Sequence, residues 1–309
     1  MIKNEYGKLR EVILHKPNLR ELKAMPAEKA MYATIKTPDY YKVLQEFNEY
    51  VVLLESLGIK VWLDEDAPEY ISPNNIFMRD IAAVIGNTMI IGNPAYDIRK
   101  NEVTNFKNFL ASSGLQSKFN IIELNGSCKF EGADLFVLDN KQIIISVGNR
   151  TNIQAHDRIK SSFSRDGWKV NIVTALPEGI PQHILGGKHI VNKDTIISRT
   201  KLNSHTVHKS FKNVIHLPED SEVLNGYACN VVTIGPNEII MPAGNPFTKR
   251  HYEKHGLTVH ETPTHEITNC IAELCKNIFT ILAIIIPMSP IIRNEPNLVK
   301  SLLVVYPYI

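Results

Sequence analysis

Four segments of the chain place two short apolar runs on either side of a turn. They are Ala82–Gly92, Leu135–Val147, His189–Arg199 and Val231–Pro242. In each, turn-forming Asn, Asp, Gly or Pro separates two runs rich in Ile and Val, which is the pattern of a β-hairpin. The turns recur every roughly 40–50 residues, and such a period predicts a repeated supersecondary unit.

Helical patterns lie between the hairpins. Asp39–Gly58, Asn101–Gly114 and Thr248–Gly256 have helical periodicity and end in glycine, and Asp39 is a plausible N-cap. Further apolar runs such as "IKVWL" and "VNIVTAL" follow the helices, while "REVILHKP" and the C-terminal region supply the first and last units. We expect an α/β fold in which about five strand–hairpin–helix units close into a ring, a propeller-like arrangement.

The same ring predicts one domain over residues 1–309, because no Gly/Ser-rich or Pro-rich linker divides the chain. A doubly wound nucleotide-binding sheet is the alternative, but a hairpin in every unit is unusual there. Neither GxGxxG nor GxxxxGK[ST] occurs in the sequence. We therefore expect no nucleotide cofactor.

Polar residues stand just before each hairpin. Asp80 precedes the first, Glu131 and Asp134 the second, His183 the third, Cys229 and Asn230 the fourth, and Cys275 belongs to the last unit. Equivalent positions in a ring of repeats converge on its axis. Acid, imidazole and thiol groups from different units would therefore meet there.

This combination of side chains suits a particular chemistry. A cysteine thiolate is a nucleophile and a neighbouring protonated histidine favours it, while histidine can also protonate a leaving amine and activate water. Two carboxylates without a metal suit a planar guanidinium, which presents five donors in a fixed fork. The pattern indicates attack of a cysteine on the central carbon of a guanidine, through a thiouronium intermediate.

These segments together resemble the pentein, or guanidino-group-modifying, superfamily: arginine deiminases, dimethylarginine dimethylaminohydrolases and amidinotransferases. The similarity runs from "YGKLREVILHKP" to about Cys275, through "NNIFMRD", "FEGADLFVLDNKQIIISVGNRTN", "PQHILGG" and "YACNVVTIGPNEIIMPAGNPFTKRHYEKHG". It implies a five-fold pseudo-symmetric α/β-propeller. It also implies a metal-free site that needs no cofactor.

The resemblance also assigns roles to single residues. It implies Cys275 as nucleophile, His183 as general acid and base, Asp80 and Glu131 as guanidinium partners, and Arg150 as partner of a substrate carboxylate, with Asn74, Phe77, Arg79 and Asp134 as further substrate-binding candidates. Simpler interpretations stand beside these: an Arg79–Asp80 structural ion pair, and a turn held by Asp134. Cys229 is the competitor for the nucleophile, and Cys128 and Cys270 are expected to be small buried hydrophobes.

Two departures from the superfamily pattern matter. Arginine deiminases and many amidinotransferases have an acid two residues after the histidine, where this chain has Leu185. One carboxylate fewer favours an alkylated guanidine over arginine itself. The turn before the cysteine, "NCIAELCKN", lacks the usual glycine, and the chain diverges from the superfamily from about residue 279.

Composition narrows the choice of partner and compartment. The net charge is +2 without a basic block, which argues against nucleic acid. The first residues contain no secretory h-region, and Ile278–Met288 is shorter than the about 20 residues that a bilayer needs, so it is expected to be a buried strand or short helix. We expect a cytoplasmic protein with a small guanidino substrate and no membrane contact, and a homo-oligomer is possible through the apolar "SLLVVYPYI".

Three functions fit these observations. The first is a hydrolase that converts a guanidino compound to a ureido product. The second is an amidinotransferase, in which an acceptor amine replaces water. The third is a non-catalytic relative that binds an arginine-like ligand or a protein. His189 is not a catalytic candidate in any of them, because strand alternation makes it a solvent-facing or cross-strand residue.

Overall fold

The computed structural model describes residues 2–24, 38–65, 72, 74–174, 183–202, 206–269 and 284–286. Four three-stranded sheets within these residues share one plan, in which an antiparallel hairpin is followed by a strand parallel to its second arm. They are β3 (Ala82–Ile85), β4 (Thr88–Ile91) and β5 (Asn120–Glu123); β6 (Leu135–Leu138), β7 (Gln142–Val147) and β8 (Lys169–Thr174); β9 (Lys188–Asn192), β10 (Thr195–Arg199) and β11 (Asn213–Leu217); and β12 (Val232–Gly235), β13 (Glu238–Pro242) and β14 (Thr258–Thr262). All four predicted hairpins are confirmed.

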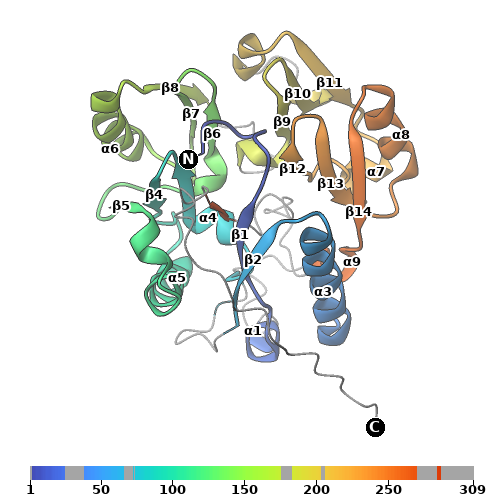
Figure 1. Ribbon diagram of the computed structural model, residues 1–309, viewed down its shortest axis with the longest axis horizontal. Helices are drawn as coiled ribbons and strands as arrows, with labels where there is room; N and C mark the ends of the chain where they lie inside the picture. Colours follow the sequence, from blue (N-terminus) through green and yellow to red (C-terminus); the bar gives the residue numbers. More distant parts are fainter. Residues whose placement is uncertain are drawn as a thin grey trace, which may run out of the picture.

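A fifth sheet joins residues from near both ends of the sequence. Strand β1 (Glu11–His15) runs parallel to β2 (Lys60–Asp64) and antiparallel to β15 (Ile284–Ile286). The plan matches the other sheets, except that the antiparallel arm comes from the far end of the chain. The three described residues of the predicted strand or helix at Ile278–Met288 are thus a strand, and the remainder lies outside the described residues. In Figure 1 strands β4 to β8 lie on the left, β9 to β14 lie on the right, and β1 and β2 run through the middle of the view.

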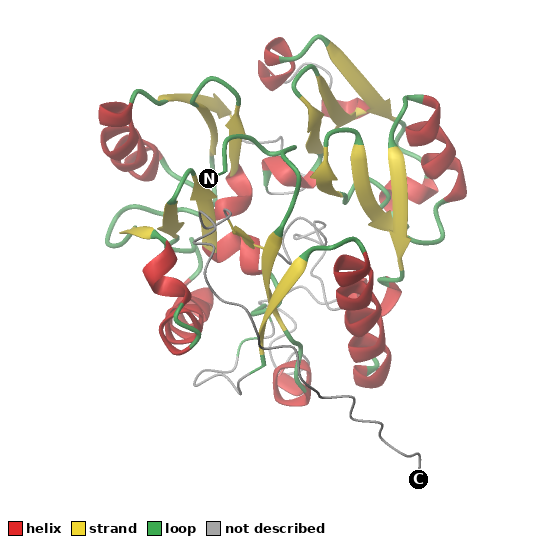
Figure 2. Cartoon of the chain, in the orientation of Figure 1, coloured by secondary structure: helices red, strands yellow, loops and turns green. Residues whose placement is uncertain are grey.

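Helices connect the second and third strand of most sheets. They are α3 (Tyr40–Ser56), α5 (Lys100–Ser112), α6 (Ile153–Phe163) and α8 (Pro246–Lys254), and they lie on the outside of the molecule (Figures 1 and 2). Between β10 and β11 the described connection contains two short 3₁₀ turns, Thr200–Leu202 and Thr206–Ser210. The short helices are α1 (Leu19–Ala24), α4 (Met78–Ile81), α7 (Ser221–Leu224) and α9 (His265–Asn269).

The sequence signals at the helix ends act as expected. The Asp39 side chain accepts hydrogen bonds from the backbone N–H groups of Tyr41 and Lys42, so it caps α3. Gly58 and Gly256, which follow α3 and α8, have φ values of 74° and 79°, a conformation that glycine adopts without steric cost. Each predicted helix is confirmed to within about two residues at its ends.

Apolar residues are buried on both faces of the sheets. The largest hydrophobic cluster gathers the inner faces of four sheets, with Val12, Phe136, Ile190 and Val232 among its members. Separate clusters fill the space between a sheet and its outer helix, such as α5 on β3 and β4 or α6 on β6 and β7. Strands in such a position have no solvent face.

This double coverage corrects the expectation for His189. Its side chain is only 2% exposed, so the solvent-facing alternative is wrong, while the cross-strand alternative agrees with its position opposite Ile197. Alternation along β9 separates two buried faces rather than a wet and a dry one. Burial lowers the pKa of His189 to about 3, which keeps the imidazole neutral.

No helix in the described part of the chain combines the length and the apolar character that crossing a bilayer requires.

Candidate active site

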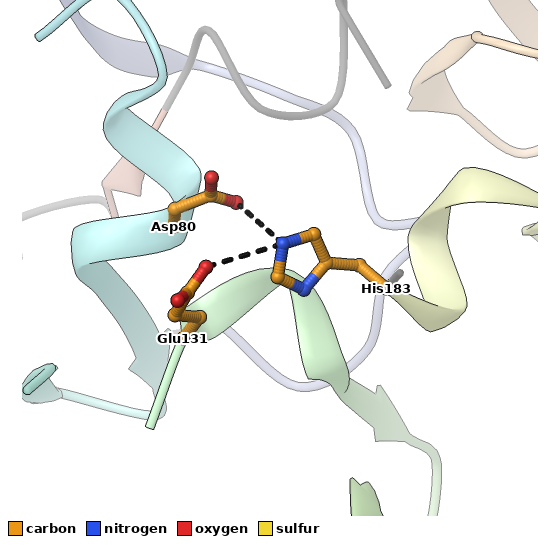
Figure 3. Close-up of side chains that lie close together, drawn as sticks. All are labelled: Asp80, Glu131 and His183. Atoms are coloured by element: carbon orange, nitrogen blue, oxygen red, sulfur yellow. Dashed lines mark ion pairs between the residues drawn. The ribbon is translucent and has the colours of Figure 1, made fainter. Parts of the chain in front are cut away.

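Three side chains from three different repeat units lie close together (Figure 3). His183 Nε2 lies 3.2 Å from Glu131 Oε2 and 3.7 Å from Asp80 Oδ1. All three residues are fully buried. Neither ring nitrogen of His183 has a hydrogen-bond partner among the described residues, so these contacts are close ion pairs.

The repeat in the sequence explains the convergence. Asp80 lies in α4 just before β3, whereas Glu131 and His183 each precede a single 3₁₀ turn that leads into β6 or β9. Glu131 and His183 have similar extended backbone angles, with φ and ψ of −121° and 128° in one and −109° and 151° in the other. The same local conformation in two units directs both side chains to the centre.

Asp134 lies on the other side of the imidazole ring. Its Oδ1 is 3.3 Å from His183 Nδ1 and accepts a hydrogen bond from the backbone N–H of Ile184, while Thr151 donates to its Oδ2. Asp134 was expected to bind substrate or to hold a turn. In the described arrangement it orients His183 between carboxylates on both ring nitrogens.

Arg99 is a member of the site that the sequence did not reveal. Its Nη1 lies 2.7 Å from Asp80 Oδ2 and 3.2 Å from Glu131 Oε2. Its Nη2 lies 2.8 Å from Glu102 Oε2, and its Nε also donates to Glu102. Arg99 and Glu102 are 2% and 1% exposed, so this fork is internal. A protein guanidinium thus already lies against both carboxylates.

A signal for this pair was present in the sequence. Arg99 and Glu102 are three residues apart at the beginning of the helix that follows the first hairpin. Charged residues with this spacing normally stabilise an exposed helix surface, so the spacing alone does not indicate a buried pair. Their burial depends on tertiary packing.

The predicted arginines have different surroundings. Arg150 Nη1 lies 3.1 Å from Glu131 Oε1, and its guanidinium carbon lies 4.4 Å from the centre of the Tyr96 ring. Arg150 therefore belongs to the cluster. The Arg79 side chain instead donates to the carbonyls of Gly132 and Leu135 and pairs with Glu5.

The remaining predicted residues lie around α4 and the His183 turn. Phe77 and Leu185 are each 2% exposed and belong to the largest hydrophobic cluster. The carbonyl of Asn74 accepts a hydrogen bond from the backbone N–H of Phe77, which closes a turn before α4. The position two residues after His183 is therefore apolar and buried.

The expected nucleophile, Cys275, lies outside the described residues, as does Cys270. Cys229 is 3% exposed and packs in an apolar cluster with Val231 and Tyr252. Burial raises its pKa to about 12, which makes it a poor nucleophile. The expectation that Cys128 is a small buried residue is only partly correct, because it is partly exposed and its Sγ lies 3.6 Å from the carbonyl of Gln154.

The charges in the cluster set its protonation. Burial opposes a proton on His183, but the carboxylates of Asp134, Asp80 and Glu131 outweigh it and hold the pKa of His183 well above its usual range. Burial would raise the pKa of Glu131, but Arg99, His183 and Arg150 hold it well below its usual range. For Asp134 burial dominates and raises the pKa. At neutral pH the site therefore contains an imidazolium beside an ionised Glu131.

A metal ion is a poor match for the described arrangement. Ligand atoms of Asp80, Glu131 and His183 lie within 4.8 Å of one another. The Arg99 guanidinium contacts both carboxylates, however, and the imidazole bears a proton. The cluster is thus arranged around a guanidinium, whose fork matches carboxylate geometry.

Comparison with known proteins now identifies the family. The family described as N,N dimethylarginine dimethylhydrolase, eukaryotic, matches residues 32–243, more than half of the chain. The chain belongs to this family. It is a dimethylarginine dimethylaminohydrolase-family member of the pentein superfamily, as the sequence motifs predicted.

Two relatives with similar sequences are consistent with this family assignment. A dimethylarginine dimethylaminohydrolase of Pseudomonas aeruginosa is 24% identical over 229 residues, which cover 74% of this chain and 84% of the relative. An arginine deiminase of Borreliella afzelii is 23% identical over 274 residues, which cover 73% and 64%. These two relatives are named for activities on arginine or dimethylarginine.

Solved structures show that the fold is the mixed α/β fold of penteins. The P. aeruginosa dimethylarginine dimethylaminohydrolase, complexed with citrulline, has a TM-score of 0.72 at 18% identity and covers 90% of this chain and 99% of its own. The saxitoxin-pathway amidinotransferase SxtG of Microseira wollei has a TM-score of 0.71 at 16% identity, covering 95% and 98%. Hydrolases and a transferase thus share this fold.

Proposed function

We propose that this family member is a metal-free hydrolase of a guanidino compound, with an alkylated arginine as the favoured substrate. One observation carries the proposal: Asp80 and Glu131 bind a guanidinium in the structure, that of Arg99. A substrate guanidinium has the same donors and charge, so these carboxylates are suited to anchor it. Asp80 Oδ1 has no hydrogen-bond partner among the described residues and offers an acceptor to a substrate N–H.

The proposed reaction begins with the thiolate of Cys275, which the positive charge of His183 favours. The sulfur attacks the central guanidine carbon, a carbon–nitrogen bond breaks, and the amine leaves with a proton from His183. A thiouronium remains on the sulfur. Neutral His183 then takes one proton from water, whose oxygen bonds to the same carbon. The carbon–sulfur bond breaks, the second proton passes to solvent water, and a ureido product and the Cys275 thiolate form.

Other residues hold the substrate in this proposal. Asp80 and Glu131 bind the guanidinium and keep its plane fixed. Arg150 binds a substrate carboxylate, for which it would exchange part of its contact with Glu131. Asp134 keeps the imidazole oriented through Nδ1. Arg79 acts indirectly, through its hydrogen bonds to the carbonyls of Gly132 and Leu135.

The preference for an alkylated guanidine depends on Leu185. This residue is apolar and buried where relatives that act on arginine have an acid. A site with one carboxylate fewer has fewer acceptors for the N–H groups of an unsubstituted guanidinium. The named activities of the relatives support the same substrate class.

The fold proposal follows the sheet plan. We propose that the five sheets are the blades of a five-fold pseudo-symmetric propeller whose last blade is completed by β1 and β2. The shared strand order and the central meeting of Asp80, Glu131 and His183 support it.

An amidinotransferase remains the alternative enzyme, because a structurally similar protein has that activity. The deciding experiment incubates the purified chain with arginine, methylated arginines and agmatine, with and without an acceptor amine. Ureido product without acceptor supports the hydrolase, and a new guanidine only with acceptor supports the transferase. Absence of both products, together with tight binding of a guanidine, would support a non-catalytic role.

A further inference from the structure

The N-terminal segment, residues 2–9, joins three sheets through residues of their hairpins. Its main chain bonds to one residue in each: Ile2 exchanges two hydrogen bonds with Gly86 (3.1 and 2.8 Å), Glu5 donates to Val137 (3.0 Å) and Leu9 donates to Ile234 (2.8 Å). Gly86, Val137 and Ile234 belong to the hairpins β3–β4, β6–β7 and β12–β13. The segment thus crosses the molecule before β1 begins.

One side chain of this segment points inward. Glu5 Oε1 accepts a hydrogen bond from Arg79 Nη2 at 3.2 Å and another from the backbone N–H of Val137 at 3.0 Å. The side chains of Glu5 and Arg79 are only 10% and 5% exposed. A buried ion pair with additional hydrogen bonds has a defined geometry, and removing one partner leaves an unpaired charge.

Arg79 in turn connects the first and second repeat. Its Nε donates to the carbonyl of Gly132 at 3.3 Å, and its Nη2 donates to that of Leu135 at 3.1 Å. Arg79 adjoins Asp80 in α4, and Gly132 adjoins Glu131. The guanidinium therefore links the two segments that carry the carboxylates of the site.

The main chains of these segments touch directly. A Cβ atom on Gly132 would lie 2.4 Å from the carbonyl oxygen of Arg79 and 2.6 Å from that of Ala82, closer than real contacts allow. Glycine is therefore required at this position, where the two backbones are in direct contact. The Arg79 hydrogen bonds to Gly132 and Leu135 join the same two segments beside this contact.

We propose that Glu5 and Arg79 are positioning residues through which the N-terminal segment fixes the separation of Asp80 and Glu131. This inference rests on the proposed function for its catalytic consequence, but the separation itself is a property of the free protein. Arg79 then supports the reaction without touching substrate. An altered separation changes the contact of both carboxylates with His183 and with a bound guanidinium.

The test compares Glu5→Gln and Arg79→Gln with Asp139→Asn. Asp139 binds Asn4 and Tyr6 of the same segment, so its variant loosens the segment at the surface and leaves the Glu5–Arg79 pair intact. The first readout is the NMR titration of the His183 ring in a Cys275→Ser background, which needs no turnover. The second is kcat and KM on the best guanidine, and the third is thermal unfolding.

The proposal predicts that Glu5→Gln and Arg79→Gln shift the His183 titration by at least about half a pH unit. They should also lower kcat by about tenfold or more, since small displacements of positioned groups have effects of this size. Asp139→Asn should lower thermal stability. The pH midpoint of the His183 titration should stay unchanged, and kcat should stay within about twofold of that of the parent. Arg79→Lys, which keeps the charge, should recover part of kcat.

Two results would overturn the inference. In one, Glu5→Gln behaves like Asp139→Asn, with lower stability and an unchanged His183 titration. In the other, Arg79→Gln raises KM alone and leaves the titration unchanged, which would indicate direct substrate contact. If the parent protein turns over no guanidine, the proposed function fails, yet the titration still decides the positioning role.

Discussion

Arg99 lies with Nη1 2.7 Å from Asp80 Oδ2, so that the protein holds one of its own guanidinium groups at the carboxylate proposed to receive one. The same nitrogen lies 3.2 Å from Glu131 Oε2. Burial would lower the pKa of Arg99, but the charges of Glu102, Asp80 and Glu131 outweigh it and hold the pKa well above its usual range. Arg99 therefore stays charged and keeps the two anchoring carboxylates compatible with each other.

The first prediction concerns this charge. Arg99→Gln leaves Asp80, Glu131 and Glu102 buried without their shared cation, and breaking such an arrangement costs about 3–5 kcal/mol of unfolding free energy. Urea denaturation at pH 7 measures the change. The control Lys107→Gln breaks an exposed pair with Glu123 and should cost less than about 1 kcal/mol. Equal effects of both variants would contradict the role given to Arg99.

The second prediction concerns Asp134, whose charge contributes most to the raised pKa of His183 after burial opposes it. Asp134→Asn should lower the pKa of His183, so that the ring loses its proton at a lower pH. The basic limb of kcat/KM against pH should move to lower pH by the same amount. Asp166→Asn, at an exposed position, should leave the profile in place. A basic limb unmoved by Asp134→Asn would show that His183 is not the group that titrates.

The third prediction uses a second buried histidine. His15 lies between Asp64 (2.9 Å) and Glu21 (3.0 Å). Burial opposes its charge, yet the hydrogen bonds to these carboxylates raise its pKa to about 9. Because the pKa of His15 is higher in the folded than in the unfolded protein, its protonation stabilises the fold. This contribution is complete below the unfolded pKa of about 6.5 and is lost as the pH rises to about 9.

Unfolding free energies of the parent and of His15→Gln, measured at pH 6 and pH 9.5, test this. The parent should lose about 3 kcal/mol more than the variant over this interval, which is the shift converted at 1.36 kcal/mol per unit. Equal losses would mean that His15 is neutral in the folded protein.

The fourth prediction concerns substrate choice at Leu185. Leu185→Asp places an acid two residues after His183, and should raise the ratio of kcat/KM for arginine over methylarginine by about tenfold. Leu185→Asn has a similar size without the charge and should change this ratio little. Because Leu185 is buried, both variants should lose stability, so thermal unfolding must be compared as well. If Leu185→Asp left the ratio of kcat/KM for arginine over methylarginine unchanged, Leu185 would not determine substrate specificity.

The sequence predicted the hairpins well because turn residues and β-branched runs are local signals. It also predicted that Asp80, Glu131 and His183 would meet, because a repeat places equivalent residues together. The features that the sequence did not predict depend on tertiary packing. Arg99 and Glu102 have the spacing of an exposed helix pair, and nothing local indicates that α5 begins inside the site. For His189 the sequence left a solvent-facing and a cross-strand alternative, and only the second is correct, since alternation cannot distinguish a sheet covered on both faces.

The fifth sheet was foreseen only as a need for further strands. Pairing of Val12 with Ile285 joins positions near opposite ends of the sequence, and no periodicity specifies such a partner. The contact between Arg79 and Glu5 could not be predicted from the sequence either. Their contacts depend on how closely Gly132 approaches the main chain of Arg79.

The central claim is that Cys275 forms a covalent bond to a guanidine carbon beside His183. The most direct measurement is intact-protein and peptide mass spectrometry after treatment with a haloamidine, for the parent, His183→Ala and Cys229→Ser. The account predicts one adduct, on Cys275, that persists in Cys229→Ser and is strongly reduced in His183→Ala. An adduct on Cys229 or Cys128, or labelling of Cys275 that does not depend on His183, would contradict it.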